Sequence, residues 1–376
     1  MLIECHTVRD RSQLEDFIQF PHDLYKNDPL YVPEIYMGQK RMFDKKTYPF
    51  FQYGDAELYL AFKNNVLSGR IAAIDNPRYN DIHGSNVGFF GFFDCIRDPE
   101  VAKALINVAS AFSVKKGHSR IIGPVNYTTN ETAGILIDGF DSPPVVLMTY
   151  NAAYYPELLE FAGCKKEMDL LAYFLDLKTV NKRSVLLQEK LEERLLGHGI
   201  TVRNVTRKSL EKDALKIQSL YNSAWEKNWG FVPFTPMEFH QLKKELLLIL
   251  DTDFVLMAEK EGTAIGFSIT IPDVNEILIH NKRGRLWPFG IFRLLFGKSA
   301  TKKMRVLALG VEKRYRNKGI EALFFARNIK EAERKNKTGA EASWILENNH
   351  EMNRALEKLN GYAYKTYRLY SKNLSL

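Results

Sequence analysis

The sequence predicts an α/β protein built on a mixed β-sheet. Apolar strand-like runs alternate with amphipathic helical segments along most of the chain. Residues 304–349 contain a buried strand, a basic turn with a glycine, an amphipathic helix and a second strand, an order that makes the two strands parallel neighbours. Residues 349–361 also match residues 151–163 without a gap, which indicates two related units.

The first unit is expected over residues 1–178. A helix over 13–20 leads into an aromatic and proline-rich covering loop that reaches residue 53. The elements predicted after it are a hairpin over 56–74, a strand over 86–93, a helix over 99–116 capped by Asp98, strands over 120–125 and 145–150, and a helix over 155–162.

The second unit is expected over residues 179–376, after a linker at 178–183. Its helices are predicted over 184–196, 210–225, 236–250, 320–335 and 351–359. Its strands are predicted over 201–205, 254–259, 264–271, 304–311, 341–347 and 363–370.

Composition limits the classes of partner. The net charge of +8 over 376 residues favours anionic partners, namely CoA phosphates, a membrane surface or nucleic acid. Cys5, Cys95 and Cys164 are scattered and show no metal spacing, so we expect free thiols and no metal site. The start lacks a signal peptide's apolar core, and no apolar run approaches the roughly 20 residues of a membrane span. A cytoplasmic protein is expected.

The turn after residue 311 is a candidate phosphate site. Arg314, Arg316 and Lys318 precede Gly319, where the helix begins. Unpaired N–H groups and the positive end of a helix dipole meet at such a turn, and cations strengthen its attraction for phosphate. Glycine allows the phosphate to approach the backbone closely. The alternative is an ordinary solvated basic turn.

Residues 311–320 resemble the acyl-CoA pyrophosphate loop of the GNAT (GCN5-related) N-acyltransferases. That loop runs valine, four residues, Arg or Gln, two residues, Gly, one residue, then Gly or Ala; here Glu321 stands at the last position. The element order of 200–372 is similar to the GNAT fold as well. The resemblance implies acetyl-CoA or a longer acyl-CoA as co-substrate. The residues it assigns to CoA are Leu309, Gly310, Val311, Arg314, Arg316, Asn317, Lys318, Gly319 and Ile320, with Asn348 or Asn349 beside the pantetheine arm.

Asn349 has an alternative role, and the first unit departs from the pattern of a CoA site. Asn349 fits equally well as the N-cap of the following helix. The repeat makes residues 94–100 the counterpart of the phosphate loop in the first unit, but this stretch has no glycine turn and carries three acids. The expected architecture is therefore two GNAT-like domains in tandem, of which the first is degenerate and does not bind CoA.

N-acylation requires an amine that has lost its proton. For an alkylammonium this costs about 4 kcal/mol at pH 7, at about 1.36 kcal/mol per pKa unit, so a general base helps. Glu312 and Glu347, at the ends of the two central strands, are the candidate bases; the alternative is that they are exposed acids or partners of nearby cations. The tyrosine acid of many GNAT enzymes is replaced by Leu356 here, and Tyr367 on the last strand is the candidate in its place, with packing as the competing role.

Residues 282–298 form an aromatic and basic insertion between two strands. From 277 to 311 there are eight Lys or Arg and no acid. The segment suits contact with an anionic membrane surface, the wall of a tunnel for a long acyl chain, or a helix packed on the other domain.

The sequence thus predicts an acyl-CoA-dependent N-acyltransferase that acts on a primary amine, either a small molecule or a lipid. Residues 343–349 and 365–370 also resemble a bacterial subgroup that includes ceramide-synthase-like acyltransferases, which implies a sphingoid-type amine. One alternative is a Fem-type aminoacyl-tRNA-dependent transferase; the CoA-type loop argues against it, so no nucleic acid partner is expected. The other is a non-catalytic GNAT-fold binding protein. The expected location is the cytoplasm, with peripheral contact at the inner membrane face if the insertion binds lipid.

Overall fold

The computed structural model of the chain describes residues 2–226, 228–281, 283–287 and 290–374. The strands are β1 (Ile3–Thr7), β2 (Asp55–Lys63), β3 (Val66–Asp75), β4 (Val87–Cys95), β5 (Arg120–Gly123), β6 (Ile135–Asp138), β7 (Lys165–Asp176), β8 (Ile200–Asn204), β9 (Val255–Lys260), β10 (Thr263–Pro272), β11 (Lys303–Val311), β12 (Gly339–Leu346) and β13 (Tyr362–Asn373). They join in one mixed sheet that runs through the whole molecule.

The helices lie on both faces of this sheet. They are α1 (Arg11–Leu24), α2 (Tyr36–Met42), α3 (Pro77–His83), α4 (Pro99–Lys115), α5 (Tyr155–Phe161), α6 (Arg183–Leu186), α7 (Gln188–Gly197), α8 (Leu210–Ala224), α9 (Pro236–Ile249), α10 (Asn275–Leu278), α11 (Gly290–Gly297), α12 (Ile320–Arg334) and α13 (His350–Lys358). Short 3₁₀ turns are η1 (Pro49–Gln52), η2 (Thr252–Phe254), η3 (Lys298–Ala300) and η4 (Lys313–Tyr315).

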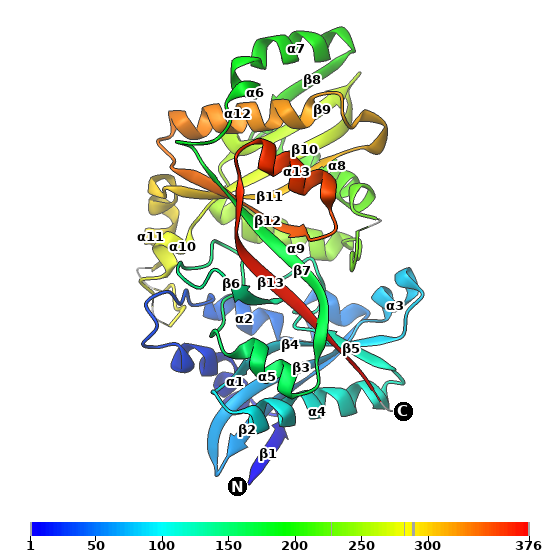
Figure 1. Ribbon diagram of the computed structural model, residues 1–376, viewed down its shortest axis with the longest axis vertical. Coiled ribbons are helices and arrows are strands. Elements are labelled where there is room, and N and C mark those ends of the chain that lie inside the picture. Colours follow the sequence, from blue (N-terminus) through cyan, green and yellow to red (C-terminus); the bar gives the residue numbers. More distant parts are fainter. Residues whose placement is uncertain (1, 227, 282, 288–289, 375–376) are drawn as a thin grey trace.

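The two halves of the chain exchange their last strands. The sheet order is β1-β2-β3-β4-β5-β13-β7-β12-β11-β10-β9-β8, with β6 paired to β13. The last strand of the second half, β13, therefore pairs with β5 of the first half, and β7 of the first half pairs with β12 of the second. The strands β7 and β13 cross the middle of the molecule as a long antiparallel pair, and both chain ends lie at the first half (Figure 1).

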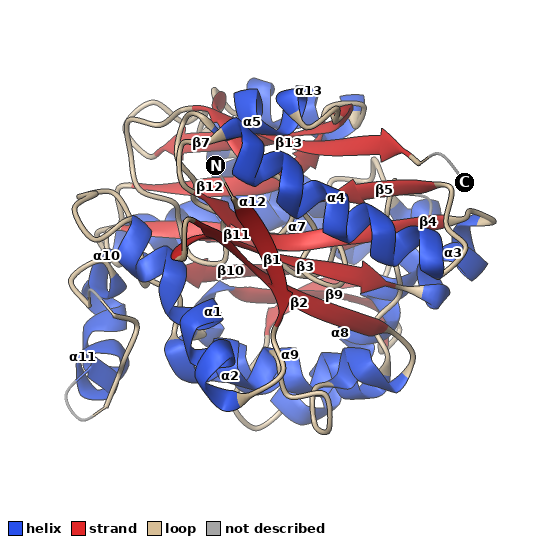
Figure 2. Ribbon diagram, turned by 90° about the horizontal axis from the view of Figure 1, so that it is seen from below, coloured by secondary structure: helices blue, strands red, loops and turns tan. Residues whose placement is uncertain are grey.

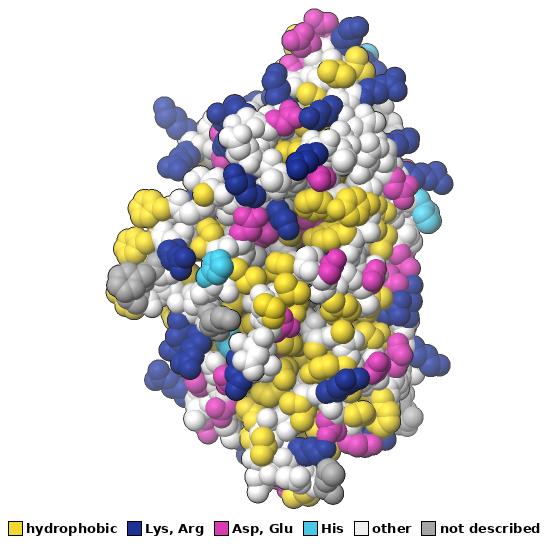
Figure 3. All heavy atoms as spheres, turned by 60° about the vertical axis from the view of Figure 1, so that its left-hand side comes forward, with side chains coloured by type: hydrophobic (Ala, Val, Ile, Leu, Met, Phe, Trp, Pro, Cys, Tyr) yellow, Lys and Arg dark blue, Asp and Glu magenta, His cyan; other side chains and the backbone are white. Residues whose placement is uncertain are grey.

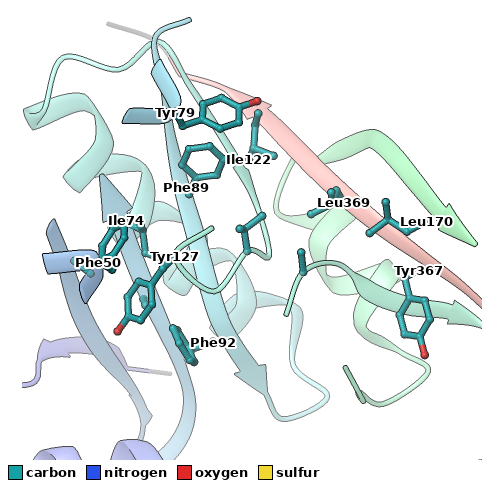
Figure 4. Close-up of a cluster of buried hydrophobic side chains, with 14 of the residues drawn as sticks. Phe50, Ile74, Tyr79, Phe89, Phe92, Ile122, Tyr127, Leu170, Tyr367 and Leu369 are labelled. Carbon is teal, nitrogen blue, oxygen red and sulfur yellow. The ribbon is translucent and has the colours of Figure 1, made fainter. Parts of the chain in front are cut away.

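Each half buries one helix layer on each face of its part of the sheet (Figure 2). In the first half, α4 and α5 pack on one face, and α1 packs on the other. In the second half, α12 and α7 cover one face, and α8 covers the other. The apolar cluster under α1 continues across the exchanged strands, because Leu170, Tyr367 and Leu369 belong to it together with Phe50 and Tyr127 (Figure 4).

The mixed α/β class and most predicted elements are confirmed, but the strand predicted over 145–150 is wrong. This stretch is a loop, and the additional strand lies earlier, at β6. Leu147 has φ 62°, and the carbonyls of Val146 and Leu147 accept hydrogen bonds from the Arg305 side chain instead of from a neighbouring strand. The loop predicted up to residue 53 also contains α2 and η1.

In the first half, the strand pair and the helix end that correspond to the predicted phosphate turn are closed. Its parallel pair β4–β5 ends at Phe89 and Ile122, and the chain that follows stays attached to β4 through the Val125 N–H, 2.7 Å from the Phe90 carbonyl oxygen. The N-terminus of α4 is capped by the Asp98 carboxylate, which accepts from two backbone N–H groups. A phosphate at this helix end would meet a negative charge.

Candidate functional site

The central feature of the second half is a gap between two parallel strands. The strands β11 and β12 are paired from Lys303 with Gly339 to Val306 with Ala342. Beyond that rung each strand follows its other neighbour, since β11 stays paired with β10 up to Val311 and β12 stays paired with β7 up to Leu346. The two strands therefore separate in a V whose closed end lies at Leu307 and Ser343.

The peptide groups of β11 that face this gap can be assigned from the hydrogen bonding on its other edge. The Glu312 N–H donates to the Ile265 carbonyl at 2.9 Å, so it faces β10. Successive residues of a strand alternate in the direction of their peptide groups. Leu309 and Val311 therefore direct theirs towards the gap, as expected for residues that would bind a pantetheine arm. A Cβ at Gly310 would lie 2.7 Å from the Trp225 ring, so the glycine there is required by close packing.

The basic turn joins the open end of the V to α12. Gly319 is the N-cap of α12, has φ 102°, and carries no capping side chain. The first N–H groups of α12 are therefore available to a ligand, in contrast to those of α4. Arg314 and Lys318 lie over the Tyr315 ring at 5.0 and 5.2 Å. The turn therefore presents cations and open N–H groups in one place, a combination that suits a pyrophosphate.

Arg316 lies at the mouth of the gap. Its Nε donates to the Val311 carbonyl at 3.1 Å, and a terminal nitrogen lies 3.4 Å from the Ala224 carbonyl at the end of α8. Replacement by alanine is expected to weaken binding of CoA by about 1–3 kcal/mol, the range for a hydrogen bond with a charged group. Calorimetry with CoA measures this, with Arg334→Ala at the far end of α12 as control. Equal affinities of the Arg316 variant and the control would place the phosphate site elsewhere.

Glu321 occupies part of the phosphate cradle. Burial raises the pKa of its carboxyl, while its own backbone N–H and the nearby Arg316 act in the opposite direction. A carboxylate in the first turn of α12 would repel a pyrophosphate bound at this helix end. The cations, the glycine and the open helix end fit a CoA pyrophosphate, and Glu321 is the residue that opposes it.

We expect Glu321→Gln to tighten CoA binding about two- to fivefold, because a charge near a helix terminus contributes about 0.3–1 kcal/mol. Binding to the unmodified protein should also strengthen as the pH falls towards the pKa of Glu321, because protonation removes the same charge. In Glu321→Gln, this part of the pH dependence of CoA binding should be absent. Calorimetry across pH measures both effects, with Glu333→Gln as control, and weaker binding by the Glu321 variant would show that the carboxylate supports the ligand.

The two carboxylates predicted as general bases lie at the open end of the V. Glu312 follows β11 directly and accepts from Arg314 Nε at 2.8 Å. Glu347 follows β12 and accepts from Lys166 Nζ at 2.7 Å and from the Asp169 N–H at 3.0 Å. Glu312 thus contacts the basic turn and Glu347 contacts β7, and both follow the ends of their strands rather than lying at the closed end of the V.

The other predicted residues of this region have mainly structural contacts. Asn348 is exposed, and Asn349 caps α13 by accepting from the Met352 N–H at 3.2 Å, which confirms its role as N-cap. Leu356 is buried in the apolar cluster between α12 and β7. Tyr367 is fully buried, and its hydroxyl has no partner among the described residues.

A buried polar cluster lies at the closed end of the V. Glu341 on β12 is 0% exposed and accepts hydrogen bonds from the hydroxyls of Ser343 and Tyr364. Ser343 Oγ in turn accepts from Arg305 Nε at 3.1 Å. Burial raises the pKa of Glu341, although Arg305 and the two hydroxyl groups act in the opposite direction. A carboxylate with a raised pKa beside a gap is a candidate proton acceptor.

The same cluster holds a loop of the first half against the gap. Arg305 donates to the carbonyls of Val146 and Leu147, each at 2.9 Å. Asp273, after β10, accepts from the Val146 N–H at 2.9 Å and from the Asn275 N–H at 3.1 Å. Burial raises the pKa of Asp273 to about 7 despite these two hydrogen bonds. Both halves therefore contribute to the closed end of the V.

Glu341, Arg305 and Tyr364 are not among the site residues that the sequence predicts. A signal was present, because Arg305 and Glu341 are opposite charges in two strands predicted to be buried parallel neighbours, and they face each other in the observed register. A charge in such a strand is rare unless it is partnered. Tyr364 could not be placed, because its strand reaches the cluster only through the exchange.

This fold and gap define a tandem GNAT-fold protein. No family model matches the chain. It is 32% identical over 374 residues to "Protein YghO" of Escherichia coli, covering 98% of this chain and 95% of that protein. It is also 32% identical over 374 residues to "Bacterial ceramide synthase" of Caulobacter vibrioides, covering 98% and 96%. The chain belongs to the family of these two proteins. A solved tandem GNAT protein from the clavulanic acid biosynthesis pathway shares the fold, with a TM-score of 0.58, 10% identity, and coverage of 100% of this chain and 99% of that one.

Proposed function

We propose that the chain is an acyl-CoA-dependent N-acyltransferase whose acceptor is a long-chain amine. The observation that carries the proposal is the gap between β11 and β12, which opens towards the uncapped N-terminus of α12. From Val311 to Leu307 the strand is roughly 13 Å long at about 3.3 Å per residue. An extended pantetheine arm is of similar length, so a pyrophosphate at the basic turn would bring the thioester to the closed end of the V.

The polar cluster then supplies the proton transfer. The amine nitrogen attacks the thioester carbonyl carbon, an N–C bond forms, and the C–S bond breaks. The proton released by the amine passes through the Ser343 hydroxyl to Glu341 and ends on the CoA sulfur. Arg305 and Tyr364 are positioning residues, because both make hydrogen bonds to members of this relay.

The lipid nature of the acceptor is supported by two observations. One relative is named a bacterial ceramide synthase, and a ceramide is the amide of a fatty acid with a long-chain amino alcohol. The first position of β11 beyond the paired rungs, Leu307, belongs to an apolar cluster with Val146 and Leu294. Apolar side chains therefore adjoin the polar cluster at the closed end of the V.

The test is amide formation with purified protein. Palmitoyl-CoA or acetyl-CoA is supplied with sphinganine, free CoA thiol is followed by a chromogenic disulfide, and the product is identified by mass. We expect thiol release that depends on the amine and is faster with palmitoyl-CoA. Absence of binding to either acyl-CoA in calorimetry would exclude the enzyme proposal, and retention of aminoacyl-tRNA on a filter would instead favour the Fem-type alternative.

A further inference from the structure

The segment around α11 exposes an unusual set of apolar side chains. The exposed fractions are 83% for Trp287, 54% for Phe292, 40% for Leu295 and 77% for Phe296. The large exposed hydrophobic residues of the described chain include one tryptophan and three phenylalanines, and all of these except Phe161 belong to this segment. Isolated exposed leucines are ordinary, but clustered exposed aromatic residues mark an interaction site.

Positive charge surrounds these side chains. Arg283 and Arg293 are exposed beside them, and the sequence from 277 to 311 contains no acid. In Figure 3 the hydrophobic side chains stand out at the left edge of the molecule, with Lys and Arg side chains nearby. We call Trp287, Phe292, Leu295 and Phe296, together with Arg283 and Arg293, the α11 surface.

The α11 surface is fixed to the body of the protein. Leu294, on the inner side of α11, is 1% exposed and packs in a cluster with Ile249, Ile271 and Leu278. Lys298 Nζ donates to the Leu248 carbonyl at the end of α9 at 3.0 Å. Arg285 pairs with Glu15 at 2.9 Å and lies over the Tyr36 ring at 4.5 Å. Phe292 and Phe296 are therefore exposed on a helix that stands off the main body (Figure 2), and Trp287 is exposed shortly before this helix begins.

We propose that the α11 surface binds the headgroup region of an anionic phospholipid bilayer. Aromatic side chains favour the boundary between headgroups and acyl chains, and the arginines match the negative charge of the lipids. None of the described helices is long and apolar enough to cross a bilayer.

The α11 surface lies close to the closed end of the gap between β11 and β12. Leu294 of α11 and Leu307 at the closed end of the V belong to the same apolar cluster. Docking through α11 would bring the closed end of the gap close to the bilayer, where a long-chain amine is dissolved. This step rests on the proposed function, whereas the docking itself does not.

Vesicle flotation tests the docking without any reaction. The full chain is mixed with vesicles of phosphatidylcholine alone or of phosphatidylcholine with phosphatidylglycerol. We expect binding to the anionic vesicles that weakens as salt is added. Phe296→Ser and Trp287→Ser should each weaken binding about tenfold, because each removes a large apolar side chain from the interface, and Arg293→Glu should weaken binding to anionic vesicles selectively.

Phe161→Ser provides the matched control, since Phe161 is a comparably exposed phenylalanine (50%) on α5 of the first half. It should bind vesicles like the unmodified protein. Absence of binding to both vesicle types, or equal binding to both, would overturn the proposal. Self-association in light scattering that Phe296→Ser abolishes, without vesicle binding, would also overturn it and make the surface an interface between copies of the chain. None of these results depends on whether the protein acylates an amine.

Discussion

Replacement of Glu341 by glutamine is expected to lower kcat about 100-fold or more while leaving acyl-CoA affinity unchanged. General-base catalysis contributes on this scale, and glutamine keeps the side-chain shape but cannot take up the amine's proton. The affinity should be preserved because Glu341 lies at the closed end of the V, whereas the CoA phosphates are expected at the basic turn. Stopped assays of amide formation and calorimetry with acyl-CoA separate the two effects.

The pH profile distinguishes a base from a structural carboxylate. Because burial raises the pKa of Glu341, the rate in the unmodified protein should rise with pH as Glu341 loses its proton. Glu341→Gln should remove the part of this rise that belongs to Glu341 and leave the part that comes from deprotonation of the amine. Ser343→Ala should lower the rate without changing the pH at which Glu341 titrates. Glu347→Gln is the control, because Glu347 is bound to Lys166 and the Asp169 N–H. A Glu347 variant with the larger loss of rate would transfer the role of base to that residue.

Local sequence pattern was sufficient for the second half because its elements are contiguous. The strand, basic turn, helix and strand of residues 304–349 carry their own periodicity, and Gly319 with its neighbouring cations predicts a phosphate turn from contiguous residues alone. The gap follows from the fold that this order implies. The N-cap role of Asn349 could also be predicted, because it depends only on the three residues that follow.

The polar cluster could not be predicted in the same way, because it depends on long-range strand pairing. Glu341 obtains one hydrogen bond from Ser343 two residues away and another from Tyr364 on β13, which crosses to the first half. Arg305 finds its acceptors in the loop at 146–147 of the first half. Alternation of apolar residues indicates which face of a strand is buried but does not specify its neighbours.

The exchange of β7 and β13 links the two halves mechanically. The strand β13, which follows α13 of the second half, pairs with β5 of the first half, and β7, which follows α5 of the first half, pairs with β12 of the second. Neither half can lose the strand that the other supplies without exposing a sheet edge. The first half thus supplies β7 to the sheet of the second half, and its residues 146–147 line the closed end of the V. The division into residues 1–178 and 179–376 accordingly describes chain order, and the two units share one sheet.

Replacement of Arg305 by methionine is expected to destabilise the protein by about 3–5 kcal/mol at neutral pH, the usual cost of breaking a buried charged network. Arg305 is 4% exposed. Its loss would leave the carbonyls of Val146, Leu147 and Ser343 without their donor. It would also remove the charge that most favours the ionised form of Glu341. Denaturant unfolding measures the loss, and Arg327→Met, which removes a surface ion pair with Glu192, should cost much less.

The pH dependence and a double variant separate these two contributions. The pKa of Glu341 in the folded protein is above its ordinary value of 4.5, so its contribution to stability is present below that value and is lost as the pH rises through the folded pKa. Without Arg305 the folded pKa rises further, and the destabilisation should be larger at high pH than at low pH. In Arg305→Met/Glu341→Gln this dependence should disappear, and part of the stability should return because no uncompensated charge remains. The remaining loss then reports the unpaired carbonyls, whereas a double variant less stable than Arg305→Met at every pH would show that Glu341 stabilises the fold through its hydrogen bonds alone.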